Sequence, residues 1–102
     1  MQTNYKSQGL VLGNLWGGGR AAYPAREVEA ESFENLIAQN QKMLKSGALD
    51  SGMGFDGLRG AVLYIRKIET KKDGFKRESM LEPVYVGELS DLERVELGSV
   101  YF

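Results

Sequence analysis

Two glycine-rich segments carry the residues of this sequence that are best suited to hold a ligand. The first, LWGGGR, spans residues 15–20, and its three consecutive glycines can turn several backbone N–H groups toward one point. Arg20 follows the glycines and can bind a phosphate through two hydrogen bonds, while Trp16 precedes them and offers an aromatic face to a base. These residues predict an anion site, although a tight turn between strands, with Trp16 anchored in the core, would use the same composition.

The second segment, DSGMGF, spans residues 50–55 and combines a carboxylate, a hydroxyl, two glycines and two apolar side chains. Such groups can hydrogen-bond ribose hydroxyls, let a ligand approach the backbone and cover the face of a base. Arg59 lies just beyond the segment. A simple connection from a helix to a strand would use similar turn-forming residues. Because both segments combine glycines, an aromatic residue and an arginine, we favour a shared ligand.

The sequence contains no histidine and no cysteine, which narrows the chemistry open to it. Thiol nucleophiles, thiolate metal sites and serine–histidine or cysteine–histidine catalysis are excluded. Asp50 and Asp56 remain as a conceivable acid–base pair, and an enzyme built on carboxylates alone often needs Mg²⁺. Turn-forming aspartates are commoner, so we expect a binding protein that needs no cofactor and no metal. The alternatives are a phosphodiesterase or glycohydrolase acting on a cyclic nucleotide, and a structural interaction module with no small ligand.

Charged residues are distributed unevenly along the chain, although the net charge is only −1. Residues 1–26 and 59–77 are basic, whereas residues 27–58 and 78–102 are acidic. The small net charge predicts no bulk attraction to duplex nucleic acid or to an acidic membrane. Two explanations of the pattern stay open: salt-linked, solvated surfaces, or two cationic segments that meet to hold an anion.

At 102 residues the chain is expected to form a single domain over residues 1–102.

The sequence of the first half of the chain predicts two extended regions and one helix. Residues 5–12 are typical of a strand, and residues 22–30 are expected to be extended because they contain a proline. The helix is predicted over residues 33–46, with Ser32 as its N-cap and Gly47 as the residue that ends it.

The second half predicts a hairpin followed by a short helix. Residues 61–70 are rich in strand formers, Asp73 and Gly74 mark a hairpin turn, and a return strand is expected through Phe75 and again over residues 83–89. A bulge or wide loop is expected at residues 79–82.

A capping box at Ser90–Glu93 is expected to open a helix that runs to about Leu97 and ends at Gly98. The fold class is therefore α+β, a small antiparallel sheet with one main helix and a short C-terminal helix. No apolar run has the length of a membrane span and the first 30 residues lack a signal-peptide pattern, so a cytoplasmic protein is expected.

Residues 9–25, GLVLGNLWGGGRAAYPA, and residues 47–63, GALDSGMGFDGLRGAVL, resemble the phage Thoeris anti-defence proteins of the first type. The resemblance is strongest over about residues 5–70. It implies a sponge protein of the infected bacterial host cell, one that sequesters a cyclic ADP-ribose isomer without cleaving it and so evades immune signalling. Some members of that family also bind cyclic oligonucleotides at a second site. The resemblance further implies a homodimer that assembles into a hexamer.

The resemblance also implies roles for individual residues. The glycine run with Arg20 would form an anion site, residues 50–55 would line a pocket, and arginines of the second half would contact a pyrophosphate. Phe55, Tyr64 and Phe75 compete for the role of stacking on the base. Residues 53–102 contain no asparagine, so an amide contact to the base from that half would be missing. The expected ligand-binding residues are Trp16, Gly17, Gly18, Gly19, Arg20, Tyr23, Asp50, Ser51, Met53, Gly54, Phe55, Arg59, Arg77 and Arg94.

Overall fold

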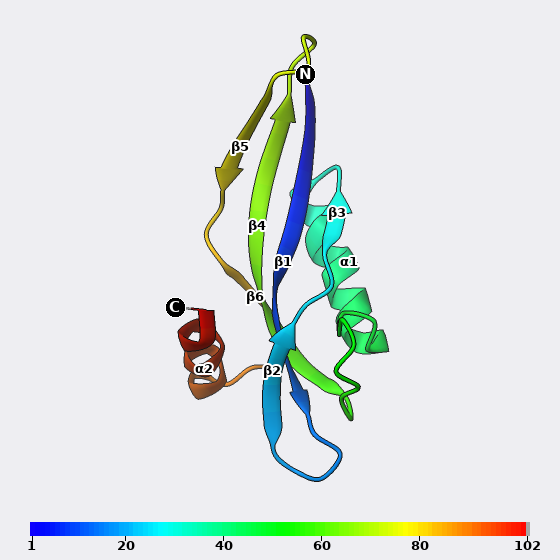
Figure 1. Ribbon diagram of the computed structural model, residues 1–102, viewed down its shortest axis with the longest axis vertical. Coiled ribbons are helices and arrows are strands. Elements are labelled where there is room, and N and C mark those ends of the chain that lie inside the picture. The colour runs from blue at the N-terminus through cyan, green and yellow to red at the C-terminus, as the bar shows by residue number, and fades with distance from the viewer. Residues whose placement is uncertain (102) are drawn as a thin grey trace.

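A computed structural model describes the backbone of residues 1–101 and the side chains of residues 1–98. This part of the chain forms a six-stranded antiparallel sheet with a main helix and a short C-terminal helix, which confirms the expected α+β class (Figure 1). The elements are, in order, β1 (Gln2–Asn14), β2 (Arg20–Pro24), β3 (Val28–Ala30), α1 (Phe33–Ser46), β4 (Leu58–Thr70), β5 (Lys76–Met80), β6 (Val84–Gly87) and α2 (Asp91–Tyr101).

Two long strands form the centre of the sheet. β1 and β4 pair along almost their whole length, β2 and β3 both pair with β1, and β5 and β6 both pair with β4. The molecule is therefore elongated, with a longest extent of 53 Å. Figure 1 shows the turn between β1 and β2 at the bottom and the β4–β5 hairpin at the top. We call residues 13–20 and 49–59 the loop end, and residues 66–80 the hairpin end.

Helix α1 has the predicted bounds, and local signals set both of its ends. The Ser32 side chain accepts a hydrogen bond from the backbone N–H of Asn35, while Gly47 adopts the left-handed conformation with φ of 84°. The helix covers one face of the sheet, where the fully buried Asn40 side chain donates to the Ser7 hydroxyl of β1. The larger core cluster lies on this face and contains Val11, Val28, Ala30, Leu36, Leu44, Leu49, Ala61, Leu63, Ile65 and Val86.

Helix α2 lies on the other face of the sheet, over a smaller core cluster. The capping box is confirmed: the Glu93 N–H donates to Ser90 Oγ, and the Ser90 N–H donates to Glu93 Oε1. The expected end at Gly98 is wrong, because the helix continues to Tyr101. Gly98 does not take the positive φ that a terminating glycine needs, and the turn before it is held by the buried side chain of Leu97. The smaller cluster contains Leu10, Leu12, Val62, Tyr64 and Leu97.

The strand boundaries differ from the expectation in several places. β4 begins at Leu58 and not at residue 61, and β5 includes Ser79 and Met80, where a bulge or wide loop was expected. The first strand is longer, covering Gln2–Asn14, and the return strand near the C-terminus is shorter, covering Val84–Gly87. The extended region at residues 22–30 divides into two strands. Between them the backbone N–H of Ala25 still donates to Gly9 of β1, whereas that of Arg26 donates to the carbonyl oxygen of Leu49.

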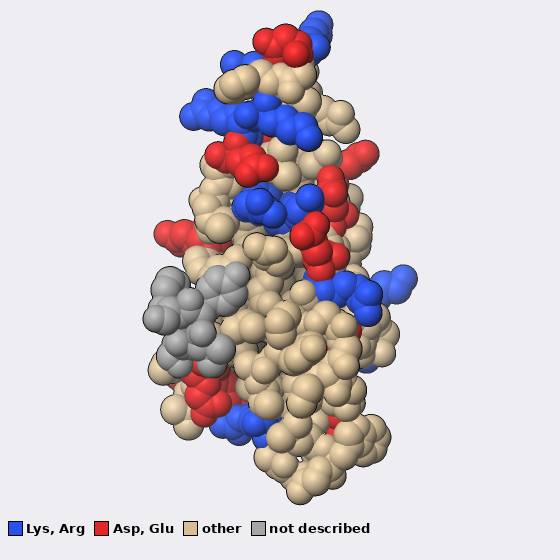
Figure 2. All heavy atoms as spheres, in the orientation of Figure 1, with Lys and Arg blue, Asp and Glu red and all other residues tan. Residues whose placement is uncertain are grey.

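The hairpin end carries positive and negative side chains in alternation. Figure 2 shows blue and red side chains interleaved over the upper part of the face in view, whereas the lower part is mostly uncharged. Arg66 pairs with Glu78 across neighbouring strands at 3.8 Å, and Glu69 lies opposite Arg77. The explanation by salt-linked, solvated surfaces therefore fits the hairpin end. No helix within the described residues is long and apolar enough to cross a membrane.

Candidate functional site

The two glycine-rich segments lie side by side at the loop end. Trp16 Nε1 donates to the carbonyl oxygen of Gly54 at 2.9 Å. The backbone of Asn14 bonds twice to the second segment, donating to the carbonyl of Gly57 and accepting from the N–H of Asp56. The two segments, distant in sequence, are thus joined by hydrogen bonds.

The first segment is a tight turn, but Trp16 is not its anchor in the core. The Leu15 N–H donates to the carbonyl of Gly19 at 3.0 Å, and the Gly18 N–H donates to the carbonyl of Leu15 at 3.1 Å. Gly18 and Gly19 have φ of 99° and 81°, which side chains with a Cβ rarely adopt. Trp16 is 76% exposed, which excludes the alternative explanation in which it is anchored in the core. Since its one polar atom already bonds to Gly54, the apolar faces of the indole remain available to a ligand.

The second segment already holds an anion, which is its own Asp50. The Asp50 carboxylate accepts hydrogen bonds from the backbone N–H groups of Gly52, Met53, Gly54 and Phe55, at 2.8–3.5 Å. Burial pushes the pKa of Asp50 upward, but these four bonds outweigh it and hold the pKa below its ordinary value. The N–H groups expected to receive a ligand are therefore occupied, and Asp50 is poorly placed to act as a general base.

Three of the expected ligand contacts serve the fold instead. The Phe55 ring lies over Gly13, where an added Cβ would come within 2.3 Å of the ring. The Ser51 hydroxyl donates to the carbonyl of Pro24 at 2.6 Å and ties the segment to β2. Tyr23 packs against the larger core cluster. Met53, by contrast, stays exposed within the second segment.

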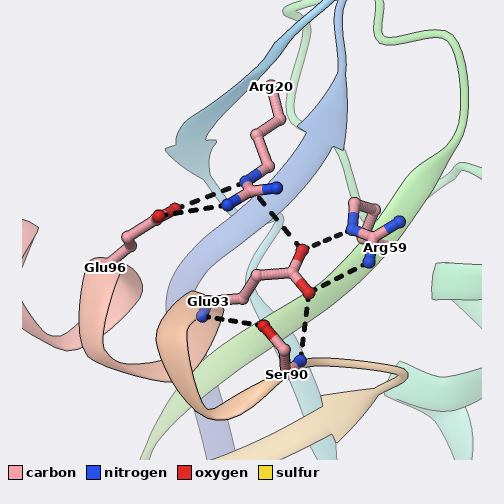
Figure 3. A network of polar contacts seen from close by, with 5 residues as sticks. All are labelled: Arg20, Arg59, Ser90, Glu93 and Glu96. Atoms are coloured by element: carbon pink, nitrogen blue, oxygen red, sulfur yellow. Dashed lines mark hydrogen bonds and ion pairs between the residues drawn. The ribbon is translucent and has the colours of Figure 1, made fainter.

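Arg20 and Arg59 converge on the first turns of α2, as Figure 3 shows. Both Nε and Nη2 of Arg59 donate to the Glu93 carboxylate, with Nη2 at 2.9 Å from Oε1. Arg20 Nη2 lies 3.1 Å from Glu96 Oε1, and Arg20 Nε lies 4.0 Å from Glu93 Oε2. The side chain of Glu93 is only 2% exposed. We call these two arginines and two glutamates the arginine–carboxylate network.

The network fixes the charge state of its members. The hydrogen bonds from Arg59 and from the backbone of Ser90 lower the pKa of Glu93 from 4.5 to about 2, against the opposing effect of burial. The glutamates in turn raise the pKa of Arg20 and of Arg59. The Glu93 carboxylate and the guanidinium groups of Arg20 and Arg59 are therefore charged at neutral pH.

A β-bulge in β4 directs Arg59 toward α2. Leu12 of β1 pairs with Gly60, but the next residue, Gly13, pairs with Leu58, so Arg59 is an extra residue in the ladder. Leu58 then packs against the larger core cluster on the α1 face, while the Arg59 side chain reaches Glu93 on the α2 face. Bulges often redirect a side chain in this way near functional sites.

Two of the expected arginines lie apart from this network. Arg77 belongs to β5 at the hairpin end, opposite Glu69. Arg94 lies on α2 with its guanidinium 5.4 Å from the centre of the Tyr85 ring. Of the arginines expected to contact a pyrophosphate, the structure brings only Arg59 next to Arg20 among the described residues.

The aromatic side chains proposed to stack on a base do not face the loop surface. Tyr64 is buried in the smaller core cluster, and Phe75 lies at the hairpin turn beside Lys71. With Phe55 packed over Gly13, the exposed aromatic side chain of the loop end is Trp16.

A groove of about 590 Å³ opens beside the loop end, and sequence reasoning missed most of it. It runs between the last turns of α1 and the start of β4. The spacing of Gln41 and Lys45, one helical turn apart, was a signal that these side chains share a face. Likewise, Glu93 and Glu96 lie three residues apart on α2, but only the capping role of Glu93 was inferred. The groove is lined by Asn14, Gln41, Leu44, Lys45, Leu58, Arg59, Gly87 and Glu88.

Within residues 1–98, no three acidic side chains gather closely enough to hold a metal ion.

The interpretation of the site rests on its own geometry. No protein-family model, curated protein sequence or solved structure matches this chain.

Proposed function

We propose that the protein is a phage anti-defence sponge that binds a cyclic ADP-ribose isomer at the loop end and sequesters it without cleavage, blocking immune signalling in the infected bacterial host cell. One observation carries the proposal: two guanidinium groups from different strands converge on a carboxylate that is almost fully buried. Paired guanidinium groups match the charge and the geometry of a pyrophosphate. The sequence resemblance of both glycine-rich segments points to the same class of ligand.

The loop end also offers surfaces for the uncharged parts of such a ligand. Trp16 presents an exposed indole whose polar atom is already bonded, which suits stacking on a base. The neighbouring groove has a volume of about 590 Å³, within the range of small-molecule sites, and Arg59 lines it as well as joining the network. A nucleotide held near Arg59 could therefore contact both features.

Retention rather than cleavage agrees with the state of the candidate base. Asp50 accepts four backbone hydrogen bonds and has a lowered pKa, so it is ill suited to take a proton from a nucleophile.

The resemblance extends the proposal to cyclic oligonucleotides at a second site and to a homodimer that assembles into a hexamer. Light scattering coupled to size-exclusion chromatography tests the assembly.

The central test is a calorimetric titration of the full chain against a panel of cyclic ADP-ribose isomers. After binding, the complex is heated and the released nucleotide is identified by chromatography. We expect intact cyclic ligand. Recovery of linear ADP-ribose alone would show an enzyme, and the absence of binding by every member of the panel would overturn the proposal.

Two matched variants test the role of the network. Arg20→Ala should weaken binding by about tenfold or more, because hydrogen bonds to charged groups are the stronger ones. Arg77→Ala removes the same charge at the hairpin end and should change binding less than twofold. If Arg20→Ala also binds within a factor of two of the wild type, Arg20 is not an anion ligand.

A further inference from the structure

The last helix supplies the anion that occupies the paired arginines in this structure. Arg20 donates to Glu96 through both Nε and Nη2, and Arg59 donates to Glu93 through the same two atoms. An arginine can use the same two donors to bind a phosphate in a bidentate manner. A phosphate group can use them only after the glutamate carboxylates have moved away.

Few of the described apolar side chains of α2 pack against the sheet. Leu97 is fully buried in the smaller core cluster, but Leu92 and Val95 are 64% and 66% exposed. An isolated helix of this length is marginally stable in water, so α2 depends on its attachment to the sheet. Besides Leu97, the described contacts that attach α2 are its ion pairs with Arg20 and Arg59 and the contacts of Arg94 with Tyr85.

We propose that Glu93 and Glu96 act as an internal competitor for the anion site, so that a pyrophosphate group binding to Arg20 and Arg59 displaces them and releases the first turns of α2 from the sheet. The identity of the natural ligand rests on the proposed function, whereas the exchange itself applies to any pyrophosphate. Release would uncover Leu10, Leu12 and Val62, which α2 now helps to bury. Binding at the loop end would thus be coupled to the position of the C-terminal helix.

Because of the charge state of the network, the displacement of the glutamates responds to a competing ligand and not to changes of pH in the physiological range. The pKa of Glu93 is held at about 2, so its carboxylate remains an anion throughout the neutral range. Arg20 and Arg59 face it from β2 and β4, Glu96 lies beside it on α2, and Glu88 adds to the negative potential near Arg59. A competing anion is therefore the means of opening the network at neutral pH.

The first test titrates inorganic pyrophosphate into the wild type and into Glu93→Gln. Glutamine keeps the capping role at this helix position but removes the competing charge. Because the free site becomes more populated, the variant should bind pyrophosphate about tenfold more tightly. Asp91→Asn is the control, since it removes the same charge from the same helix and makes none of the contacts of the network. Equal or weaker binding by Glu93→Gln, or equal tightening by Asp91→Asn, would overturn the proposal.

Hydrogen exchange of the wild type provides a second test that requires no variant. Saturating pyrophosphate should speed the exchange of the backbone amides of residues 91–97 and leave those of α1 unchanged. Unchanged or slower exchange in α2 would overturn the inference even if pyrophosphate binds. Titration with cyclic ADP-ribose isomers addresses the proposed function separately: if none binds while pyrophosphate still displaces α2, the internal competition stands and the sponge function falls.

Discussion

The two ends of the sheet use charge in opposite ways. The hairpin end has more cations than the loop end, but they are spread over two strands and the turn between them, and Arg66 pairs there with the exposed Glu78. At the loop end only two guanidinium groups reach α2, yet both approach a carboxylate that is withdrawn from water. The basic residues of the hairpin end are Arg66, Lys67, Lys71, Lys72, Lys76 and Arg77.

This difference shows that the number of charges in a segment says little about its ability to bind an anion. Exposed pairs are screened by water and ions, so each contributes little energy and little selectivity. Positive charges that converge on a single partially buried point produce a positive electrostatic potential, which attracts an anion.

The largest difference is expected in core packing. Leu49, at the start of the loop end, is fully buried, whereas Met80 at the hairpin end is mostly exposed. Leu49→Ala should lower the free energy of unfolding by about 3 kcal/mol, and Met80→Ala by less than about 0.5 kcal/mol. Urea denaturation measures both. Similar losses in the two variants would mean that the hairpin end is packed against something in solution.

A smaller difference is expected between two aspartates that hold turns. Asp50 accepts four backbone N–H groups, while Asp73 accepts one, from Phe75. Asp50→Ala should cost about 2 kcal/mol in unfolding free energy and Asp73→Ala about 0.5 kcal/mol, because the first leaves more donors without a partner. The same denaturation experiment applies. If Asp50→Ala is the milder change, the hydrogen-bond pattern described for the second segment is incorrect.

Next comes a comparison of two exposed aromatic side chains. Trp16→Ala should reduce affinity for the cyclic nucleotide by about 1 kcal/mol, the lower part of the range for stacking on a base, while Phe75→Ala should leave affinity unchanged. The chain has a single tryptophan, so ligand binding to the wild type should also change the tryptophan fluorescence. No change in fluorescence on saturation would remove Trp16 from the site.

A further difference is expected under acid. Folding lowers the pKa of Glu93 from 4.5 to about 2, so its charged form stabilises the protein above pH 4.5, and this contribution is lost as the pH falls from 4.5 toward 2. Urea midpoints at pH 5 and pH 3 should therefore differ less in Glu93→Gln than in the wild type. Glu78→Gln, which removes an exposed acid of the hairpin end, is the control. An unchanged difference in Glu93→Gln would argue against the ion pair.

Local signals in the sequence predicted the helices better than the strands. Ser32 and Gly47 set the ends of α1, and the capping box of Ser90 and Glu93 starts α2, because each signal acts through residues close in the chain. Gly98 misled the prediction for the opposite reason. Whether a glycine ends a helix depends on its φ. Gly98 has no positive φ, and with Leu97 packed against the sheet the helix continues past it.

The candidate site was only partly predictable. The similar composition of the two glycine-rich segments led us to expect a shared ligand. The Trp16–Gly54 hydrogen bond brings the segments together, and the shared ligand stays a prediction. The pairing of Arg59 with Glu93 could not be foreseen, because it depends on a bulge and on how a distant helix crosses the sheet. The role of Asp50 was open for a similar reason, since a turn-forming aspartate and a ligand contact look alike in sequence.

The bulge at Arg59 ties the anion site to the length of one strand. Loss of that single codon would let Leu58 and Gly60 continue as a regular ladder opposite Gly13 and Leu12, with the sheet still paired and the cation gone. Insertions and deletions at this point are therefore expected to create or remove the second arginine of the proposed anion site while preserving the architecture. Variation among descendants of this gene should accordingly be sought in gaps at position 59 as well as in substitutions there.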